Sequence, residues 1–193
     1  MGHGEETPGN EEQATDGSLR LLADGMLGRL ARWLRLLGYD TAYENHADDL
    51  ELARRARAEG RILLTRDRAL AARRGLRSLL IESEHVQEQV RQVVETLGPP
   101  PHPALSRCSL CNVPLEPATP RQVADRVPPY VLQTQRRFGV CPACRRVYWA
   151  GTHLQHMRRY LRSPLAGRLL SDPPAESPVA ASTASASAPE PGA

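Results

Sequence analysis

Two Cys-x-x-Cys pairs constrain the fold of this chain more than any other feature. The pairs are Cys108-Ser-Leu-Cys111 and Cys141-Pro-Ala-Cys144, with twenty-nine residues between them. Each pair places two thiolates on a tight turn, and two such turns supply four soft ligands for a tetrahedral zinc ion. Four protein ligands leave no coordination position for water, so the spacing predicts a structural Zn²⁺ rather than a catalytic one.

Disulfide bonds are the alternative use of these cysteines. Residues 1–17 carry five acidic residues and no apolar core, unlike a secretory signal, and no apolar run approaches the ~20 residues of a membrane helix. We therefore expect a cytoplasmic location without a membrane, where a reducing environment keeps thiols free to bind metal.

A proline-rich segment, Gly98-Pro-Pro-Pro-His-Pro103, separates two parts of the sequence. Neither a helix nor a central strand tolerates such a run. The two ends of the chain have no periodic apolar pattern, which is typical of disordered tails. We expect five segments: a disordered acidic N-terminus over 1–17, one domain over 18–98, a linker over 99–103, a second domain over 104–170, and a disordered Pro/Ala/Ser tail over 171–193.

Short apolar runs alternate with amphipathic stretches in the first of these domains. The pattern predicts strands over 19–24, 39–43, 61–65 and 78–81, and helices over 26–37, 48–60, 66–74 and 85–97. This βαβαβαβα order is typical of an α/β fold with a parallel sheet covered on both faces. Ligands of such sheets bind beyond the carboxyl ends of the strands.

Acidic residues follow two of the predicted strands and begin one of the helices. Asp24 ends the first strand, Asp67 comes just after the third, and Asp48 and Asp49 open the second helix. Carboxylates gathered at one edge repel one another unless a hard cation such as Mg²⁺ or Mn²⁺ binds them, and such a site suits phosphodiester cleavage. The alternative for Asp48 and Asp67 is a plain helix N-cap.

Three sequence blocks resemble the Mut-seven C-terminal RNase domain family. They are Asp24-Gly-Met-Leu-Gly-Arg-Leu-Ala-Arg-Trp-Leu-Arg-Leu-Leu-Gly-Tyr-Asp40, Asp48-Asp-Leu-Glu-Leu52 and Gly60-Arg-Ile-Leu-Leu-Thr-Arg-Asp67. The resemblance spans about residues 19–161. It implies a PIN-like domain followed by a small zinc ribbon with four cysteine ligands, and a metal-dependent ribonuclease activity.

The acidic positions of that family carry over onto Asp24, Asp49 and Asp67, with Asp48 as a neighbour and Glu51 as a weaker candidate. PIN-type nucleases usually have a fourth acid after the next strand, where this sequence offers Glu82 or Glu84. Neither is a clear match to the family pattern.

Positive charge is distributed unevenly along the chain. All 25 basic residues are arginine, which excludes mechanisms that need lysine, such as Walker A loops and Schiff bases. Residues 104–170 hold eleven arginines against two acidic residues, whereas residues 18–103 hold fourteen against twelve. The second domain therefore carries most of the positive charge, which indicates a polyanionic partner, nucleic acid first. The alternative source of the many arginines is GC-rich coding, and the charge alone leaves DNA open beside RNA.

Several basic and aromatic side chains are candidates for contacts with RNA. Arg29, Arg32 and Arg35 recur every three residues on another face of the first helix than its apolar one, and the alternative for Arg29 and Arg32 is a solvated surface. Guanidinium groups match phosphates, and aromatic rings stack on unpaired bases. The candidates are Arg29, Arg32, Arg66, Arg145, Arg146, Trp149 and His153.

These observations together predict a cytoplasmic endoribonuclease whose first domain cuts RNA, including structured or ribosome-associated RNA, and whose second domain captures it. The alternative is a non-catalytic adaptor for RNA or ribonucleoproteins with a degenerate PIN-like site. A phosphatase with Asp24 as nucleophile is disfavoured, because Met26 stands where such enzymes place a second aspartate.

Overall fold

The computed structural model describes residues 19–151 together with Leu154 and Met157. The expectations for residues 1–17, His153 and residues 171–193 lie outside this range. Within it, no helix is long and apolar enough to cross a membrane.

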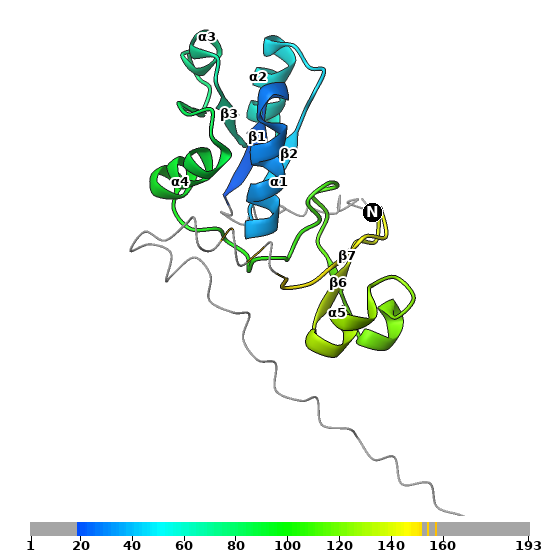
Figure 1. The fold of residues 1–193 in the computed structure, drawn as a ribbon. Helices are drawn as coiled ribbons and strands as arrows, with labels where there is room; N and C mark the ends of the chain where they lie inside the picture. Colours follow the sequence, from blue (N-terminus) through cyan, green and yellow to red (C-terminus); the bar gives the residue numbers. More distant parts are fainter. Residues whose placement is uncertain (1–18, 152–153, 155–156, 158–193) are drawn as a thin grey trace, which may run out of the picture.

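The N-terminal part, residues 19–98, is an α/β unit built on a four-stranded parallel sheet (Figure 1). The strands lie in the order β2-β1-β3-β4. The predicted alternation of strands and helices is confirmed, with these bounds: β1 Arg20–Ala23, α1 Gly28–Leu37, β2 Asp40–Tyr43, α2 Asp49–Ala58, β3 Ile62–Thr65, α3 Arg68–Ala71, β4 Ser78–Leu80 and α4 Val86–Leu97.

Helices cover both faces of this sheet. Leu21 and Ala23 of β1 point into a core with the apolar faces of α1 and α4, while Leu22 points to the opposite side, into a smaller core with α2 and α3. Successive side chains of a strand alternate between the two faces, so a strand buried on both sides is apolar throughout. This burial explains why the central strands β1 and β3 are mostly apolar, whereas the edge strand β2 begins with Asp40 and Thr41.

The C-terminal part, residues 104–151, contains a separate antiparallel sheet. Its strands β5 (Glu116–Ala118), β6 (Phe138–Val140) and β7 (Val147–Tyr148) pair in that order. A 3-10 turn, η2 (Pro120–Val123), and a short helix, α5 (Pro129–Thr134), join β5 to β6. The core of this part is small: four buried side chains, Val123, Val127, Val131 and Phe138, with partly buried neighbours.

The proline-rich segment lies against the C-terminal end of α1. Gly38 ends α1 with φ of +106°, and a Cβ atom there would lie 2.1 Å from the carbonyl oxygen of His102. The backbone N–H of Leu105 donates to the carbonyl of Leu36 at 2.8 Å. Only glycine satisfies both the left-handed turn and the close approach of the linker.

Arg35 joins the two parts of the chain. Its Nε donates to the carbonyl of Thr41 at 2.7 Å, and its Nη1 donates to the carbonyls of Ser109 and Leu110 at 3.0 and 2.7 Å. The side chain is buried, and this burial lowers its pKa below the ordinary arginine value. The expectation of an exposed stripe that includes Arg35 is therefore wrong: three backbone carbonyls hold this guanidinium inside the protein.

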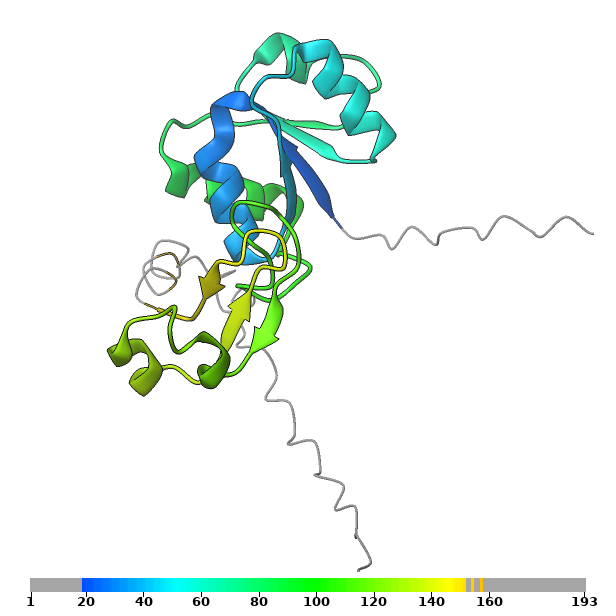
Figure 2. The same ribbon diagram turned by 90° about the vertical axis from the view of Figure 1, so that its right-hand side faces the viewer.

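A second junction surrounds Asp40 at the start of β2. Its carboxylate accepts hydrogen bonds from Arg61 at 2.8 Å and from the side-chain amide of Asn112 at 2.7 Å. The amide oxygen of Asn112 accepts the backbone N–H of Thr41 at 3.1 Å. Figure 2 shows the resulting arrangement, in which the loop before β5 reaches up beside α1 and β2.

Candidate functional site

Asp24 lies at the carboxyl end of β1, and its side chain is only 5 % exposed. One carboxylate oxygen caps the following 3-10 turn, η1 (Gly25–Leu27), by accepting the backbone N–H of Met26 at 3.0 Å. The other accepts a hydrogen bond from the hydroxyl of Thr65. A buried carboxylate without such donors would be strongly unfavourable, so both bonds help to hold it there.

Thr65 ends β3, the strand next to β1, and connects Asp24 to Asp67. While its hydroxyl donates to Asp24, the same oxygen accepts the backbone N–H of Asp67 at 3.0 Å. Asp67 itself is exposed and caps α3 through the N–H of Leu70 at 2.9 Å. These two acids therefore belong to one hydrogen-bonded corner at the carboxyl edge of the sheet.

Asp48 and Asp49 start α2 and are both exposed. Asp48 is the N-cap and accepts the backbone N–H of Glu51 at 2.8 Å. Asp49 lies 3.8 Å from the guanidinium of Arg73, which comes from the loop after α3. Of the four expected acids, Asp24, Asp48 and Asp67 thus each have a capping role.

The carboxylates do not form a compact metal cage of their own. Among the residues that the structure describes, one group of three or more Asp, Glu, His or Cys side chains is close enough together to hold a single ion. That group consists of the four cysteines. The acids offer the oxygen ligands that Mg²⁺ and Mn²⁺ prefer, but in this arrangement no three of them surround one point. The assignment of Asp24, Asp49 and Asp67 to a catalytic metal stays a prediction.

The two candidates for a fourth acid are both exposed and lie just after β4. Glu84 forms an ion pair with Arg66 at 2.9 Å, so one expected phosphate contact is already engaged with a carboxylate. The backbone N–H of Glu82 donates to the side chain of Gln92 at 3.1 Å. Neither contact brings a fourth carboxylate to Asp24.

The four cysteines form two matching turns. In each pair the N–H of the second cysteine donates to the first sulfur, at 3.3 Å for Cys111 and 3.4 Å for Cys144. The residue after each pair has a left-handed φ: 62° at Asn112 and 64° at Arg145. All four sulfurs lie within 4.8 Å of one another, and a tetrahedral Zn²⁺ with ~2.3 Å bonds needs sulfurs about 3.8 Å apart. The set therefore fits zinc.

The thiols of this cluster differ in how strongly they hold a proton. Burial raises the pKa of Cys108, but hydrogen bonds from the hydroxyl of Tyr148 and from nearby backbone amides outweigh it and lower the pKa to about 6. The neighbouring thiol of Cys144, followed by burial, raises the pKa of Cys111 to about 12. Thiolates so close together repel one another, and a bound divalent cation removes that repulsion.

Comparison with known families identifies the chain. The model of the Mut7-C RNAse domain matches residues 19–161, which include both the acidic edge and all four cysteines. This chain belongs to the Mut7-C RNAse domain family. No curated protein and no solved structure matches it significantly.

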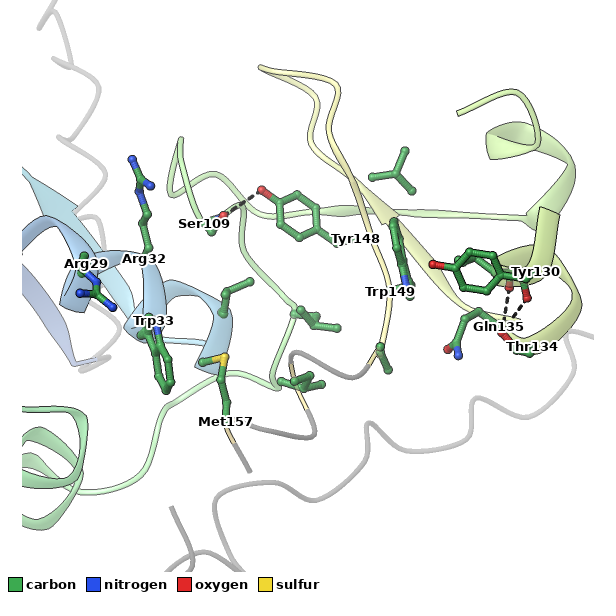
Figure 3. A pocket seen from close by; sticks show the side chains of 17 residues that line it. Arg29, Arg32, Trp33, Ser109, Tyr130, Thr134, Gln135, Tyr148, Trp149 and Met157 are labelled. Carbon is green, nitrogen blue, oxygen red and sulfur yellow. Dashed lines mark hydrogen bonds between the residues drawn. The ribbon is translucent and has the colours of Figure 1, made fainter. Parts of the chain in front are cut away.

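A pocket of about 690 Å³ lies between the two parts of this Mut7-C chain (Figure 3). It brings together three of the expected RNA contacts, since Arg29 and Arg32 line it from α1 and Trp149 lines it from the C-terminal part. Arg145 and Arg146 are exposed beside the second cysteine pair and are not among its lining residues. The separate sequence motifs did not indicate this pocket, because its lining residues come from distant segments of the chain.

Sequence reasoning missed three further residues of the candidate site. Thr65 carries the hydrogen bonds between the acids, and Tyr130 lines the pocket. Glu44 follows β2 beside Asp24, because its N–H donates to the carbonyl of Ala23 at 3.2 Å. Strand register could have revealed Glu44, but its carboxylate is paired with Arg55 at 3.1 Å.

Proposed function

We propose that this protein is a metal-dependent endoribonuclease that hydrolyses RNA phosphodiesters at the carboxyl edge of the parallel sheet. The supporting observation is Asp24, a carboxylate 5 % exposed at the end of β1 and hydrogen-bonded to Thr65 of the adjacent strand. Burial of a charged group is costly, and membership of the RNAse domain family supplies a functional reason for it.

Asp24, Asp49 and Asp67 are the proposed ligands of Mg²⁺ or Mn²⁺, and Asp48 lies beside them. When bound, such an ion would supply an activated water molecule and would balance charge on the phosphate oxygens. Thr65 orients Asp24 through its hydroxyl and restrains the backbone at Asp67. The bonds from Thr65 and from the N–H of Met26 keep the buried carboxylate of Asp24 from turning away from the edge.

The C-terminal part is proposed to act as a zinc ribbon that captures RNA. Residues 104–151 hold seven arginines and two acids, so this part attracts a polyanion. Zinc has a structural role here, because the four sulfurs fill its coordination sphere and the apolar core is small.

Cleavage of a labelled single-stranded RNA with added Mn²⁺ tests this proposal. We expect activity in the zinc-loaded protein and a loss of at least a hundredfold in Asp24→Asn and Asp67→Asn. Asp125→Asn, at an exposed position in the C-terminal part, is the matched control and should retain activity. Equal cleavage by all four proteins would indicate a contaminating nuclease and would contradict the proposal.

A non-catalytic RNA-binding adaptor is the second candidate. It is favoured by the capping bonds of Asp24, Asp48 and Asp67, which give each acid a structural role. This function predicts RNA binding that Asp24→Asn leaves unchanged, together with no cleavage at any Mn²⁺ concentration.

A further inference from the structure

The pocket between the two parts contains both tryptophans of the chain. Trp33 comes from α1, and Trp149 follows β7. Figure 3 shows Arg29, Arg32 and Trp33 on one side, with Trp149 and Tyr130 across from them. Side chains more than ninety positions apart in the sequence, such as Trp33 and Tyr130, thus line opposite walls of one cavity. Its volume of about 690 Å³ is typical of ligand pockets.

Aromatic surface is available inside this pocket. Tyr130, near the start of α5, is 66 % exposed although it is one of the largest side chains of the C-terminal part. Trp149 packs against Phe138 at a centroid distance of 6.5 Å with an interplanar angle of 58°, and this contact restrains the orientation of the indole ring. Unpaired bases stack on such rings whatever their identity.

Charge around the pocket suits a phosphate. Arg29 and Arg32 are exposed and lie about one helical turn apart on α1, and the described lining residues include no Asp or Glu. Their helix begins directly after η1, the turn that Asp24 caps. A strand bound along α1 would therefore run from the pocket toward the acidic edge.

Polar groups at the far side of the pocket can meet the edge of a base. Gln135 and Thr134 line it there, and an amide side chain offers both a donor and an acceptor. A purely aliphatic ligand would not use these groups or the two arginines. The combination of rings, cations and an amide matches a nucleotide.

We propose that this pocket takes one unpaired nucleobase of single-stranded RNA. The base stacks beside Trp149 and Tyr130, and its flanking phosphates contact Arg29 and Arg32. The inference rests on the proposed ribonuclease function for the choice of RNA as the bound strand. It adds a binding site for that strand to which both parts of the chain contribute.

Tryptophan fluorescence tests the pocket directly because both indoles line it. The probe is a decauridylate RNA, added to the zinc-loaded Asp24→Asn protein without Mn²⁺ so that no cleavage occurs. We expect quenching by this RNA and much weaker quenching by a decamer of the same length with abasic ribose units. Equal quenching by both oligonucleotides would overturn the proposal, since phosphates alone would then explain binding.

Variants separate stacking from charge. Tyr130→Ala should weaken RNA binding on the order of tenfold, while Tyr130→Phe keeps the ring and should bind as the parent does. Arg32→Ala should weaken binding and reduce its salt dependence, whereas Arg54→Ala, an exposed arginine of α2 outside the pocket, should not. Unchanged affinity in both Tyr130→Ala and Arg32→Ala would overturn the pocket assignment.

Failure of the pocket and failure of the nuclease are distinguishable. If Mn²⁺-dependent cleavage proceeds in the wild-type protein but neither Tyr130→Ala nor Arg32→Ala alters RNA affinity, only the pocket assignment is overturned. If base-dependent quenching and its loss in Tyr130→Ala are observed without any cleavage, the pocket assignment is supported and the proposed ribonuclease function falls.

Discussion

Thr65 donates the hydrogen of its hydroxyl to the buried carboxylate of Asp24 across two neighbouring parallel strands. The same oxygen accepts the backbone N–H of Asp67 at 3.0 Å. One hydroxyl group therefore positions two of the acids that we propose for catalysis. Its removal should affect both the stability of this corner and the alignment of the acids.

Thr65→Val tests this role because valine has nearly the same shape but lacks the hydroxyl. We expect a loss of about 1–3 kcal/mol in the free energy of unfolding, as Asp24 and the N–H of Asp67 both lose a partner. RNA cleavage should fall about tenfold while RNA affinity is unchanged. Urea unfolding and single-turnover cleavage measure the two effects.

The matched control is Thr41→Val on β2. Thr41 is also fully buried, but among the described residues its hydroxyl has no hydrogen-bond partner. Replacement of an unpaired buried hydroxyl by a methyl group should be neutral or stabilising. If Thr65→Val were as harmless as Thr41→Val, the hydrogen bond to Asp24 would have no positioning role.

Arg35→Met should destabilise the contact between the two parts of the chain. The substitution keeps much of the apolar stem but leaves the carbonyls of Thr41, Ser109 and Leu110 without their donor. We expect a loss of about 2–4 kcal/mol, measured by chemical denaturation. Arg32→Met, at an exposed position of the same helix, should change stability by no more than about 0.5 kcal/mol.

Removal of zinc should unfold the C-terminal part. We expect one zinc per chain by metal analysis, and loss of the defined environment of Trp149 when a chelator removes the ion. Cys144→Ser should lower zinc affinity, so that a higher zinc concentration is needed to keep the folded fluorescence spectrum. Full retention of that spectrum in protein shown to be free of metal would contradict a structural role for zinc.

The N-terminal part was predictable because its strands and helices have strong local signals. The two central strands, β1 and β3, are mostly apolar, and each main helix has a clear start or stop, such as the Asp48 cap and Gly38. Parallel strands of this kind bring their carboxyl ends to one edge, which is why Asp24 and Asp67 could be expected there.

Contacts between distant segments were not predictable in the same way. Arg35 occurs at helical spacing with Arg29 and Arg32, so the pattern gave no sign that this one guanidinium is buried against Ser109 and Leu110. The pocket depends on how α1 meets the C-terminal part, and that orientation follows from such bonds rather than from periodicity. Sequence patterns specify which face of an element is apolar, but not which polar backbone groups will approach it.

Tyr39 provides a pH-dependent test of the core. Its side chain is fully buried, its hydroxyl donates to the carbonyl of Gly98 at 2.5 Å, and burial raises its pKa above the ordinary tyrosine value. The neutral phenol of Tyr39 contributes to the free energy of unfolding through its burial and its hydrogen bond. Since its folded-state pKa exceeds the unfolded value of about 10, this contribution is complete below pH 10 and is lost as the pH rises further. Tyr39→Phe should cost about 1 kcal/mol at pH 7. Urea titrations should show the two proteins converging above pH 10, and a constant difference up to pH 12 would contradict the raised pKa.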